Sequence, residues 1–396
     1  MSNICNGLNQ RLFAEFFAGI GLMRLGLEKA GWKIAFANDI DPTKERIYQN
    51  HFKDSINHFH LGDIHHLKSN QVPNVGLATA SFPCTDLSLA GRREGLSGSQ
   101  SSAFWGFVNV LKEMGERRPP IVLLENVEGF LTSHNGQDFK EALLALNGLG
   151  YSVDTFIVDA VRFVPQSRVR LFVVGHQTAG EPEKVSEKQL SFYQSDLRPK
   201  KLADFILKHP EINWCIRELP NLPKTNARLI DVIEEIPETS KDWWNEQRVE
   251  YLLNQTFDRH RVLIETAKKG SEYTYLTAFR REREGRSMAE IRSDGIAGCL
   301  RTPKGGSARQ ILLRVGKGEI SIRLLSPREC ARLMGADEYI ISGNINQALF
   351  GFGDAVCVPV VTWIGENYLN PLLSEINNVT AKQECKHEYQ PAVIGI

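Results

Sequence analysis

The 396-residue sequence lacks both long apolar runs and a secretory leader. No segment approaches the roughly 20 consecutive apolar residues that cross a bilayer. The opening segment, MSNICNGLNQRL, has no apolar stretch of the kind that a signal peptide needs. These absences argue against a secreted or membrane-spanning protein, and we expect a cytoplasmic one.

Cysteines are few and widely spaced. There are seven, an odd number, and no CxxC pair occurs. This pattern argues against a zinc ribbon and against a disulfide framework, and we predict no bound metal. Cys84 is therefore expected to be a free thiol, which leaves it to be either a small apolar core residue or a nucleophile.

The sequence also lacks net charge, because 47 Lys and Arg residues balance 47 Asp and Glu residues. No overall positive field therefore indicates nucleic acid as a partner. Residues 279–332 are an exception, with 13 basic against 6 acidic residues and a local net charge of +7. Such a stretch is either a solvated surface or a phosphate-binding one.

A regular alternation of segments is present in the first 180 residues. Apolar, β-branched runs predict strands, and segments with apolar residues at helical spacing lie between them. This alternation predicts an α/β fold whose doubly wound, Rossmann-like parallel sheet occupies residues 11–180. The predicted strands are 11–17, 33–41, 75–82, 121–127, 151–160 and 168–175, and the predicted helices are 22–32, 102–114 and 138–150.

The alternation ends after about Gly175, and the chain length favours a second domain. Residues 181–322 predict a smaller domain of mixed structure. In 323–372 a capped amphipathic helix, RLLSPRECARLMGA, precedes a glycine turn and an apolar helix that returns to the first domain. Residues 373–396 are expected to form a loose tail.

A cofactor crevice is predicted where the first strand ends. Gly19 and Gly21 lie between that strand and the first helix, where a glycine turn lets an anionic ligand approach the helix N-terminus. Asp39 ends the second strand 20 residues after Gly19, the position of a ribose-binding acid, and Asp63 could reach an exocyclic amine. Together they indicate an adenosine pocket, which suits NAD or S-adenosylmethionine equally.

Reactive side chains follow other strands at the same edge. Cys84 comes directly after a buried segment, and Glu125 comes late in the run IVLLENV. Arg168 and Arg170 are two residues apart, so in a strand they would share one face. A thiol, a carboxyl and arginines suit methylation of cytosine at C5. The thiolate adds at C6, the acid balances charge at N3, and an arginine holds O2.

These motifs resemble the C5-cytosine DNA methyltransferase family over most of the chain outside 176–300. FAGIG resembles its cofactor turn, FPC its nucleophile motif, ENV its acid motif and QSRVR its arginine strand. RLLSPRECARLMG resembles the helix that braces the recognition domain, and FGFGDAV resembles the final cofactor motif. The resemblance implies catalytic roles for Cys84, Glu125, Arg168 and Arg170. It implies S-adenosylmethionine contacts at Phe17, Gly19, Ile20, Gly21, Asp39, Ile40, Asp63, Ile64, Pro83 and Asp354.

Two of these positions depart from the family pattern. The family commonly has an aromatic residue after the ribose-binding acid, where this sequence has Ile40. Phe17 would then contribute more of the stacking on adenine. Asp354 replaces a usual Asn near the expected amino-acid end of the cofactor, where it either pairs with the ammonium or repels the carboxylate.

The resemblance also implies contacts with double-stranded DNA. The target cytosine has to be flipped out of the duplex, because stacking hides C6 from a nucleophile. Residues 181–322 would form the target-recognition domain, with the +7 stretch contacting phosphates. The residues expected to contact DNA are Arg92, Arg93, Arg301, Lys304 and Arg309.

The function that these observations favour is DNA (cytosine-5) methylation by a monomer, in the cytoplasm or on a bacterial nucleoid. It would serve a restriction-modification system that includes a cognate restriction endonuclease. A tRNA cytosine-5 methyltransferase and a non-catalytic nucleic-acid-binding relative remain alternatives. A dinucleotide-dependent oxidoreductase would explain neither FPC nor ENV. No Lys or His adjoins Cys84 in the sequence, so its activation has to come from the fold, the substrate or the cofactor.

Overall fold

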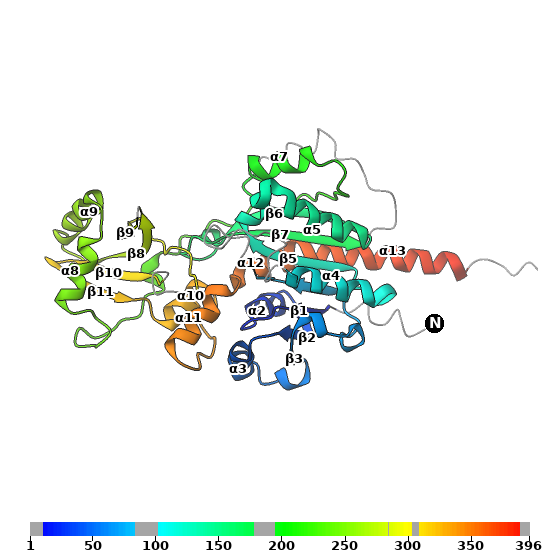
Figure 1. Ribbon diagram of the computed structural model, residues 1–396, viewed down its shortest axis with the longest axis horizontal. Coiled ribbons are helices and arrows are strands. Elements are labelled where there is room, and N and C mark those ends of the chain that lie inside the picture. Colours follow the sequence, from blue (N-terminus) through cyan, green and yellow to red (C-terminus); the bar gives the residue numbers. More distant parts are fainter. Residues whose placement is uncertain (1–10, 84–101, 178–194, 284, 303–308, 389–396) are drawn as a thin grey trace, which may run out of the picture.

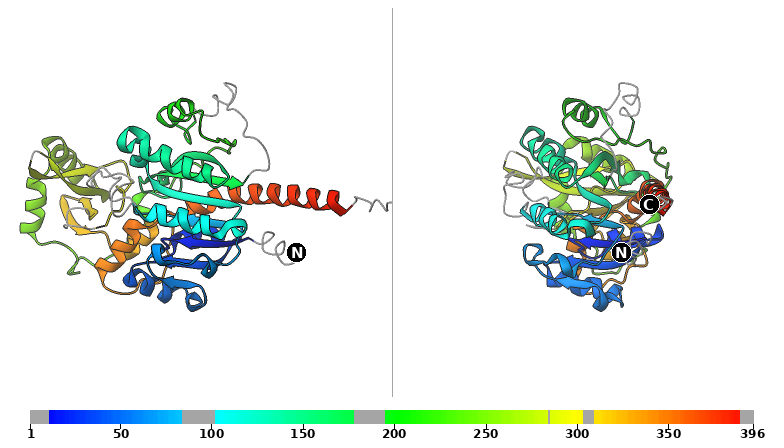
Figure 2. Two further views of the ribbon diagram at one scale, coloured as in Figure 1. Left: turned by 45° about the vertical axis from the view of Figure 1, so that its right-hand side comes forward. Right: turned by 90° about the vertical axis from the view of Figure 1, so that its right-hand side faces the viewer.

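A computed structural model describes residues 11–83, 102–177, 195–283, 285–302 and 309–388. Two sheets organise these residues into a large and a small part (Figures 1 and 2). Cys84, Arg92, Arg93 and Lys304 lie outside the described residues.

The large sheet has seven strands in the order β3-β2-β1-β4-β5-β7-β6. The first five pair in parallel, whereas β7 runs antiparallel to both β5 and β6. The predicted α/β sheet is thus confirmed, but the predicted strand 168–175, which is β7, runs antiparallel to its neighbours rather than parallel. Its strands are β1 (Leu12–Phe16), β2 (Lys33–Asp39), β3 (Phe59–Leu61), β4 (Leu77–Ala80), β5 (Ile121–Val127), β6 (Tyr151–Asp159) and β7 (Val169–Gln177).

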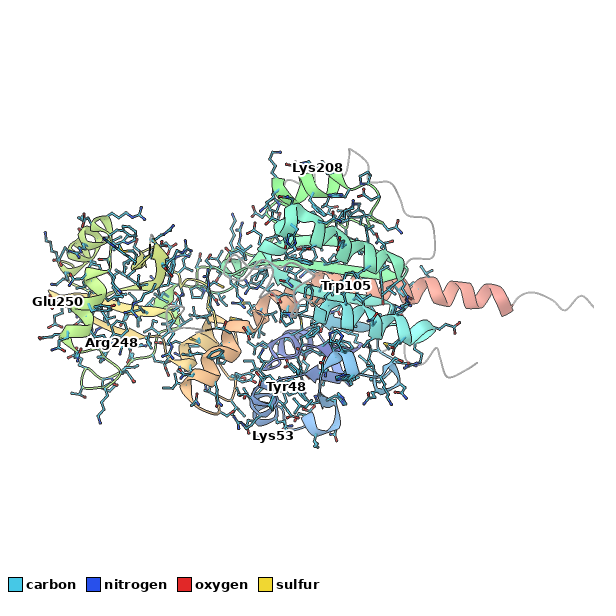
Figure 3. The ribbon with its side chains drawn as sticks, in the orientation of Figure 1. Tyr48, Lys53, Trp105, Lys208, Arg248 and Glu250 are labelled. Carbon is cyan, nitrogen blue, oxygen red and sulfur yellow. The ribbon has the colours of Figure 1, made fainter. Side chains whose placement is uncertain are left out.

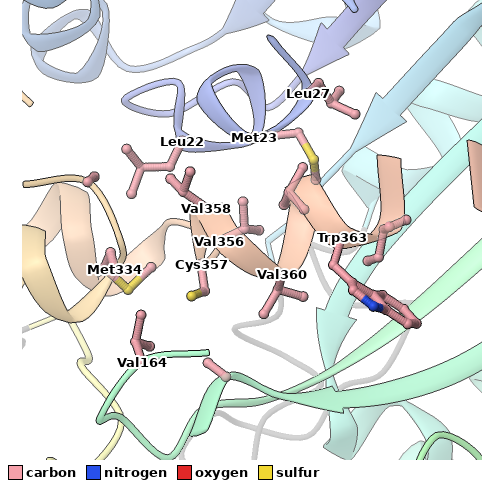
Figure 4. Close-up of a cluster of buried hydrophobic side chains, with 14 of the residues drawn as sticks. Leu22, Met23, Leu27, Val164, Met334, Val356, Cys357, Val358, Val360 and Trp363 are labelled. Carbon is pink, nitrogen blue, oxygen red and sulfur yellow. The ribbon is translucent and has the colours of Figure 1, made fainter. Parts of the chain in front are cut away.

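Helices cover both faces of this sheet, because each face presents apolar side chains that need a cover. One buried cluster joins the sheet to α2 (Leu22–Lys29), α3 (Pro42–His51) and α12 (Val358–Ile364). The other joins it to α4 (Ser102–Met114) and α5 (Gln137–Gly148). Figure 4 shows α12 lying against α2. The C-terminal part of the chain therefore completes the core that the N-terminal part begins.

The small sheet has four antiparallel strands in the order β11-β10-β8-β9. Apolar residues on one face pack with α8 (Glu246–Asn254) and α9 (Asp258–Lys268) into a separate core. The strands are β8 (Thr274–Arg283), β9 (Arg286–Arg292), β10 (Ile311–Gly316) and β11 (Glu319–Leu324). A smaller part of mixed structure is therefore present, as predicted.

Residues 195–222, assigned by sequence to the smaller domain, lie instead against the large sheet. Helix α7 (Lys200–Lys208) packs on α5, with the rings of Phe139 and Phe205 5.0 Å apart. Arg198 is buried and bonds both carboxylate oxygens of Asp154 in β6, at 2.8 and 2.9 Å. Since these contacts belong to the large core, the sequence boundary at 181 lies well before the small sheet.

Two further expectations about the C-terminal third differ from the structure. The predicted loose tail is largely helical, because α13 runs over Asn370–Glu388. The glycines of LFGFGD lie inside α11 (Ile345–Asp354) rather than in a turn. The capped helix is confirmed as α10 (Pro327–Leu333), where Ser326 and Glu329 form a capping box.

One helical stretch, Ile345–Val379, is long and apolar enough to cross a membrane by length and composition. However, 67% of its most apolar window is buried inside the protein, so core packing accounts for that composition. Within the described residues, the short helical segments are Ser55–Asn57, Ile64–His66, Ser69–Gln71, Gly115–Arg117, Glu128–Gly136, Ala160–Arg162, Leu229–Asp231 and the π-helical Gly365–Leu369.

Candidate active site

The predicted cofactor turn links β1 to α2 and needs glycine at two places. Gly19 and Gly21 have φ of 58° and 81°, in the left-handed region that favours glycine. A Cβ at Gly21 would also lie 2.5 Å from the Phe52 ring and 2.7 Å from the Tyr48 ring. Phe17 has a positive φ as well, 58°. The backbone therefore makes a tight turn with left-handed residues just before α2.

Asp39 lies beside this turn, as the sequence predicts. Its Oδ2 accepts from the backbone N–H of Gly19 at 2.8 Å, and its Oδ1 accepts from Asp41 at 2.9 Å. Ile40 is 65% exposed, so an apolar side chain is accessible next to Asp39. Asp63 accepts from the backbone N–H of His65 at 3.0 Å. Two carboxylates and an exposed apolar surface thus gather at one edge of the sheet.

Ile20 and Ile64 are placed differently from the other predicted cofactor residues. Both side chains are buried, 2% and 5% exposed. The carbonyl of Ile20 accepts from the Tyr339 hydroxyl at 2.6 Å, and the Ile64 side chain lies against Gly106 of α4. Any contact of these two residues with a cofactor would therefore come from the backbone.

Glu15, in β1 under the turn, was not among the predicted site residues. It is 2% exposed, and among the described residues its Oε2 has no hydrogen-bond partner. Burial raises the pKa of Glu15 to about 8, although the positive charge of Arg24 opposes that rise. The sequence shows that Glu15 lies close to the glycine-turn motif FAGIG, but it does not show that the side chain is buried.

Asp354, at the end of α11, has a cationic partner. Its Oδ2 lies 3.0 Å from the Nζ of Lys44 in the first turn of α3. Although desolvation lowers it, the pKa of Lys44 is raised overall by the nearby carboxylates of Asp354, Asp39 and Asp41. Nothing in the sequence linked Lys44 to Asp354, which is more than 300 positions away.

The described parts of the FPC and ENV motifs meet at the ends of neighbouring strands. β4 and β5 pair in parallel up to Ala80 and Leu124. The side-chain amide of Asn126 then donates to the carbonyl of Phe82 at 3.4 Å. Pro83, the last described residue of FPC, is exposed. The residue before Pro83 and the residue after Glu125 are thus in direct contact.

Glu125 and Arg170 form a largely buried ion pair. The Nε of Arg170 in β7 lies 2.9 Å from Oε1 of Glu125 in β5, and the side chains are 15% and 7% exposed. The antiparallel pairing of β5 and β7 sets this neighbourhood, because Glu125 lies opposite Phe172 and Val127 opposite Arg170. An oriented carboxyl next to a guanidinium suits proton transfer beside a polar oxygen.

Arg168 has different surroundings from Arg170. It precedes β7 and is 1% exposed. Its guanidinium donates to three backbone carbonyls, those of Leu300 at 2.9 Å, Gly353 at 3.1 Å and Ala355 at 2.5 Å. Desolvation, helped by the charge of Arg170, lowers its pKa. Arg168 therefore ties together three segments that are distant in sequence.

Cys299 is a second residue of this region that sequence reasoning missed. Its Sγ lies 3.3 Å from a terminal nitrogen of Arg168. Burial alone would raise the pKa of Cys299, but the charges of Arg168, Arg170 and Arg301 lower it overall. In the sequence, the feature that could have singled out Cys299 is its position among the basic residues of 279–332.

The predicted DNA contacts that the structure describes are Arg301 and Arg309. Arg301 is exposed, and Arg309 donates to the side-chain oxygen of Asn346 in α11. Both line a small cavity between the small sheet and α10, together with Leu300 and Cys330. Among the described residues, no group of three or more His, Cys, Asp or Glu is placed to hold a metal ion.

Comparisons with known proteins agree with this geometry. The family model "C-5 cytosine-specific DNA methylase" matches residues 12–370. The Type II methyltransferase M.DsaV of Dactylococcopsis salina is 28% identical over 368 residues, covering 91% of this chain and 86% of that protein. The Type II methyltransferase M.HhaI of Haemophilus parahaemolyticus is 26% identical over 361 residues, covering 90% and 93%.

Solved structures share the fold. The Entamoeba histolytica methyltransferase EhMeth superposes with a TM-score of 0.62 at 14% identity, covering 92% of this chain and 99% of that one. The S. pombe Dnmt2 methyltransferase gives a TM-score of 0.57 at 19% identity, covering 91% and 98%. The family match spans most of the chain and includes every strand of both sheets. The chain belongs to the C-5 cytosine-specific DNA methylase family and is a DNA (cytosine-5) methyltransferase that uses S-adenosylmethionine as methyl donor.

Proposed function

We propose that this enzyme methylates cytosine through a covalent step at Cys84, assisted by Glu125 and Arg170. The observation that supports the proposal best is the buried ion pair between Glu125 and Arg170, at 2.9 Å. The contact between Asn126 and Phe82 brings the ENV and FPC segments together beside it. Cys84, two residues after Phe82, lies outside the described residues, and its role follows from the FPC motif.

In this mechanism the Cys84 thiolate forms a bond to C6 of the flipped cytosine. The Glu125 carboxyl gives a proton to N3, which neutralises the charge that addition would leave on the ring. Arg170 holds O2 and keeps Glu125 oriented. C5 becomes nucleophilic and takes the methyl group, which leaves S-adenosylhomocysteine. A base then removes the C5 proton, N3 returns its proton to Glu125, and the bond between sulfur and C6 breaks, which restores the Cys84 thiolate.

Arg168 has a different task in this proposal. With four of its contacts on backbone or sulfur atoms of other segments, its guanidinium is not directed at the Glu125 pair. We assign it a positioning role, in place of the direct contact with cytosine that its spacing from Arg170 suggests. It would keep the 299–302 segment and the end of α11 beside β7.

S-adenosylmethionine supplies the methyl group when bound, and the residues at the glycine turn fit it. The left-handed backbone at Gly19, where a Cβ would meet only the carbonyl oxygen of Phe17 at 4.0 Å, leaves room for a close ligand. Asp39 would accept from ribose hydroxyls and Asp63 from the adenine amine, while exposed Ile40 offers an apolar surface to the ring. The predicted set also includes Phe17, Ile20, Ile64, Pro83 and Asp354.

DNA contacts are proposed for Arg301 and Arg309, which the structure describes, and for Arg92, Arg93 and Lys304, which it does not. Residues from about 223 to 322 would act as the target-recognition part. The Type II names of the relatives support a modification role beside a restriction endonuclease. We further propose a monomer that works in the cytoplasm, on the nucleoid if the source is bacterial.

The experiment that tests this function offers the purified enzyme duplex DNA and tRNA in parallel, with S-adenosylmethionine as methyl donor. Methyl transfer to DNA alone is expected, because the resemblance is to DNA enzymes and the small part is basic. Transfer to tRNA alone would refute the proposal and establish the RNA alternative. Bisulfite sequencing of the methylated DNA then identifies the target sequence.

A further inference from the structure

The ion pair between Lys44 and Asp354 joins two segments beside the cofactor turn. Lys44 belongs to the first turn of α3, directly after β2, and Asp354 is the last residue of α11. The 3.0 Å contact is only partly shielded, since the side chains are 26% and 44% exposed. Both charges can therefore still reach a ligand.

Packing fixes the pair close to the turn itself. Gly351, three residues before Asp354, lies so near Ile20 of the turn that a Cβ there would be 2.8 Å from the Ile20 side chain. Tyr339 also bonds the Ile20 carbonyl, at 2.6 Å. On the other side, the Asp39 carboxylate bonds Gly19 and raises the pKa of Lys44. Lys44 on α3 and Asp354 on α11 are therefore both close to the glycine turn.

We propose that Lys44 and Asp354 bind the zwitterionic amino-acid end of S-adenosylmethionine. Asp354 would accept from the α-ammonium, and Lys44 would donate to the α-carboxylate. An ammonium has three donors and a carboxylate has two oxygens, so their mutual contact leaves capacity for a ligand. The inference rests on the proposed position of the cofactor at the glycine turn.

This arrangement also accounts for an acid where the family usually has an amide. An unpaired Asp354 would repel the cofactor carboxylate. With Lys44 at 3.0 Å, the local charge is balanced, and each end of the zwitterion meets its opposite charge. The question that the sequence left open is therefore answered by a residue on another element.

Binding of three ligands by isothermal titration calorimetry tests the proposal without any turnover. S-adenosylhomocysteine has both charged groups, decarboxylated S-adenosylmethionine keeps only the ammonium, and methylthioadenosine has neither. The variants are Lys44→Met and Asp354→Asn. Lys53→Met is the matched control, because Lys53 is an exposed lysine two residues after the end of α3, at the edge of the large part (Figure 3).

Lys44→Met is expected to weaken S-adenosylhomocysteine about tenfold, as expected for a lost charge-assisted hydrogen bond. It should leave the other two ligands unchanged. Asp354→Asn should weaken both ammonium-bearing ligands and spare methylthioadenosine. Lys53→Met should change none of them. Thermal melts of each variant confirm folding, and Asp354→Asn, being nearly isosteric, keeps the test available if Lys44→Met is unstable.

Equal weakening of all three ligands, or no weakening of S-adenosylhomocysteine, would overturn the assignment. If the wild-type protein binds methylthioadenosine and Asp39→Asn weakens that binding, either result refutes the role of the Lys44–Asp354 pair but leaves the cofactor placement intact. If substitution of Asp39 by Asn also leaves methylthioadenosine binding intact, the nucleoside lies elsewhere, and both the cofactor placement and the pair's role fail.

Discussion

Replacing Arg168 by methionine would separate a positioning arginine from one that contacts the substrate. The side chain is 1% exposed, and its guanidinium bonds the carbonyls of Leu300, Gly353 and Ala355. Methionine fills much of the volume but offers no donor. The three carbonyls would then be left without their partner in a buried place.

The expected loss follows from these contacts. Each buried carbonyl left unsatisfied costs about 1–3 kcal/mol. Methionine also removes the desolvation penalty of the buried Arg168 cation, which the lowered pKa of Arg168 indicates, and this offsets part of the loss in unfolding free energy. We therefore expect Arg168→Met to lose about 2–4 kcal/mol of unfolding free energy and to lower the melting temperature by roughly 2–5 °C.

Arg170→Met is the comparison, because its guanidinium pairs with Glu125 at the predicted site of chemistry. It should change the melting temperature less and lower kcat more. The assays are thermal and urea unfolding together with methyl transfer to DNA at saturating cofactor. If Arg168→Met kept the wild-type melting temperature and lost only kcat, Arg168 would act on the substrate, and the positioning role would be wrong.

Three further variants have defined outcomes. The folded protein keeps the Glu15 proton up to about pH 8, whereas the unfolded chain releases it above about 4.5. The free energy of unfolding should therefore fall by a few kcal/mol, as an order of magnitude, as the pH rises from about 4.5 to about 8. Urea titrations of Glu15→Gln should show a smaller fall, and a pH profile identical to that of the wild type would contradict this prediction. Glu125→Gln should lower kcat about 10²- to 10⁴-fold with DNA affinity nearly unchanged, measured by methyl transfer and fluorescence anisotropy; full activity would exclude it as the acid. Gly353→Ala would place a Cβ 2.6 Å from backbone atoms of Arg301 and Thr302, so DNA binding by anisotropy should weaken; unaltered binding would separate that segment from DNA.

Local patterns were enough to predict much of the fold and part of the site. The run IVLLENV forms β5 with the predicted bounds, because four apolar residues in succession suit a strand buried on both faces. The hydrogen bond between Gly19 and Asp39 confirms that the glycine turn and the acid 20 residues later are neighbours. Such features depend on residues close in sequence or on adjacent strands.

Features that depend on distant contacts were not predictable. Strand periodicity placed Arg168 beside Arg170, but Arg168 precedes β7 and reaches carbonyls more than 130 positions away. Likewise, α7 could not be assigned to the large sheet, because its amphipathic pattern shows that one face is buried but not which surface covers it. The partner of Asp354 was hidden for the same reason.

The central claim is the covalent step at Cys84, and a mechanism-based trap tests it most directly. DNA with 5-fluorocytosine at the target should be incubated with enzyme and S-adenosylmethionine, then denatured. Because fluorine replaces the C5 proton that a base has to remove, the bond between Cys84 and C6 should persist. We predict an adduct that survives denaturation and maps to Cys84, with none formed by Cys84→Ser. Methylation of ordinary DNA without any trapped adduct, or full activity of Cys84→Ser, would contradict the mechanism.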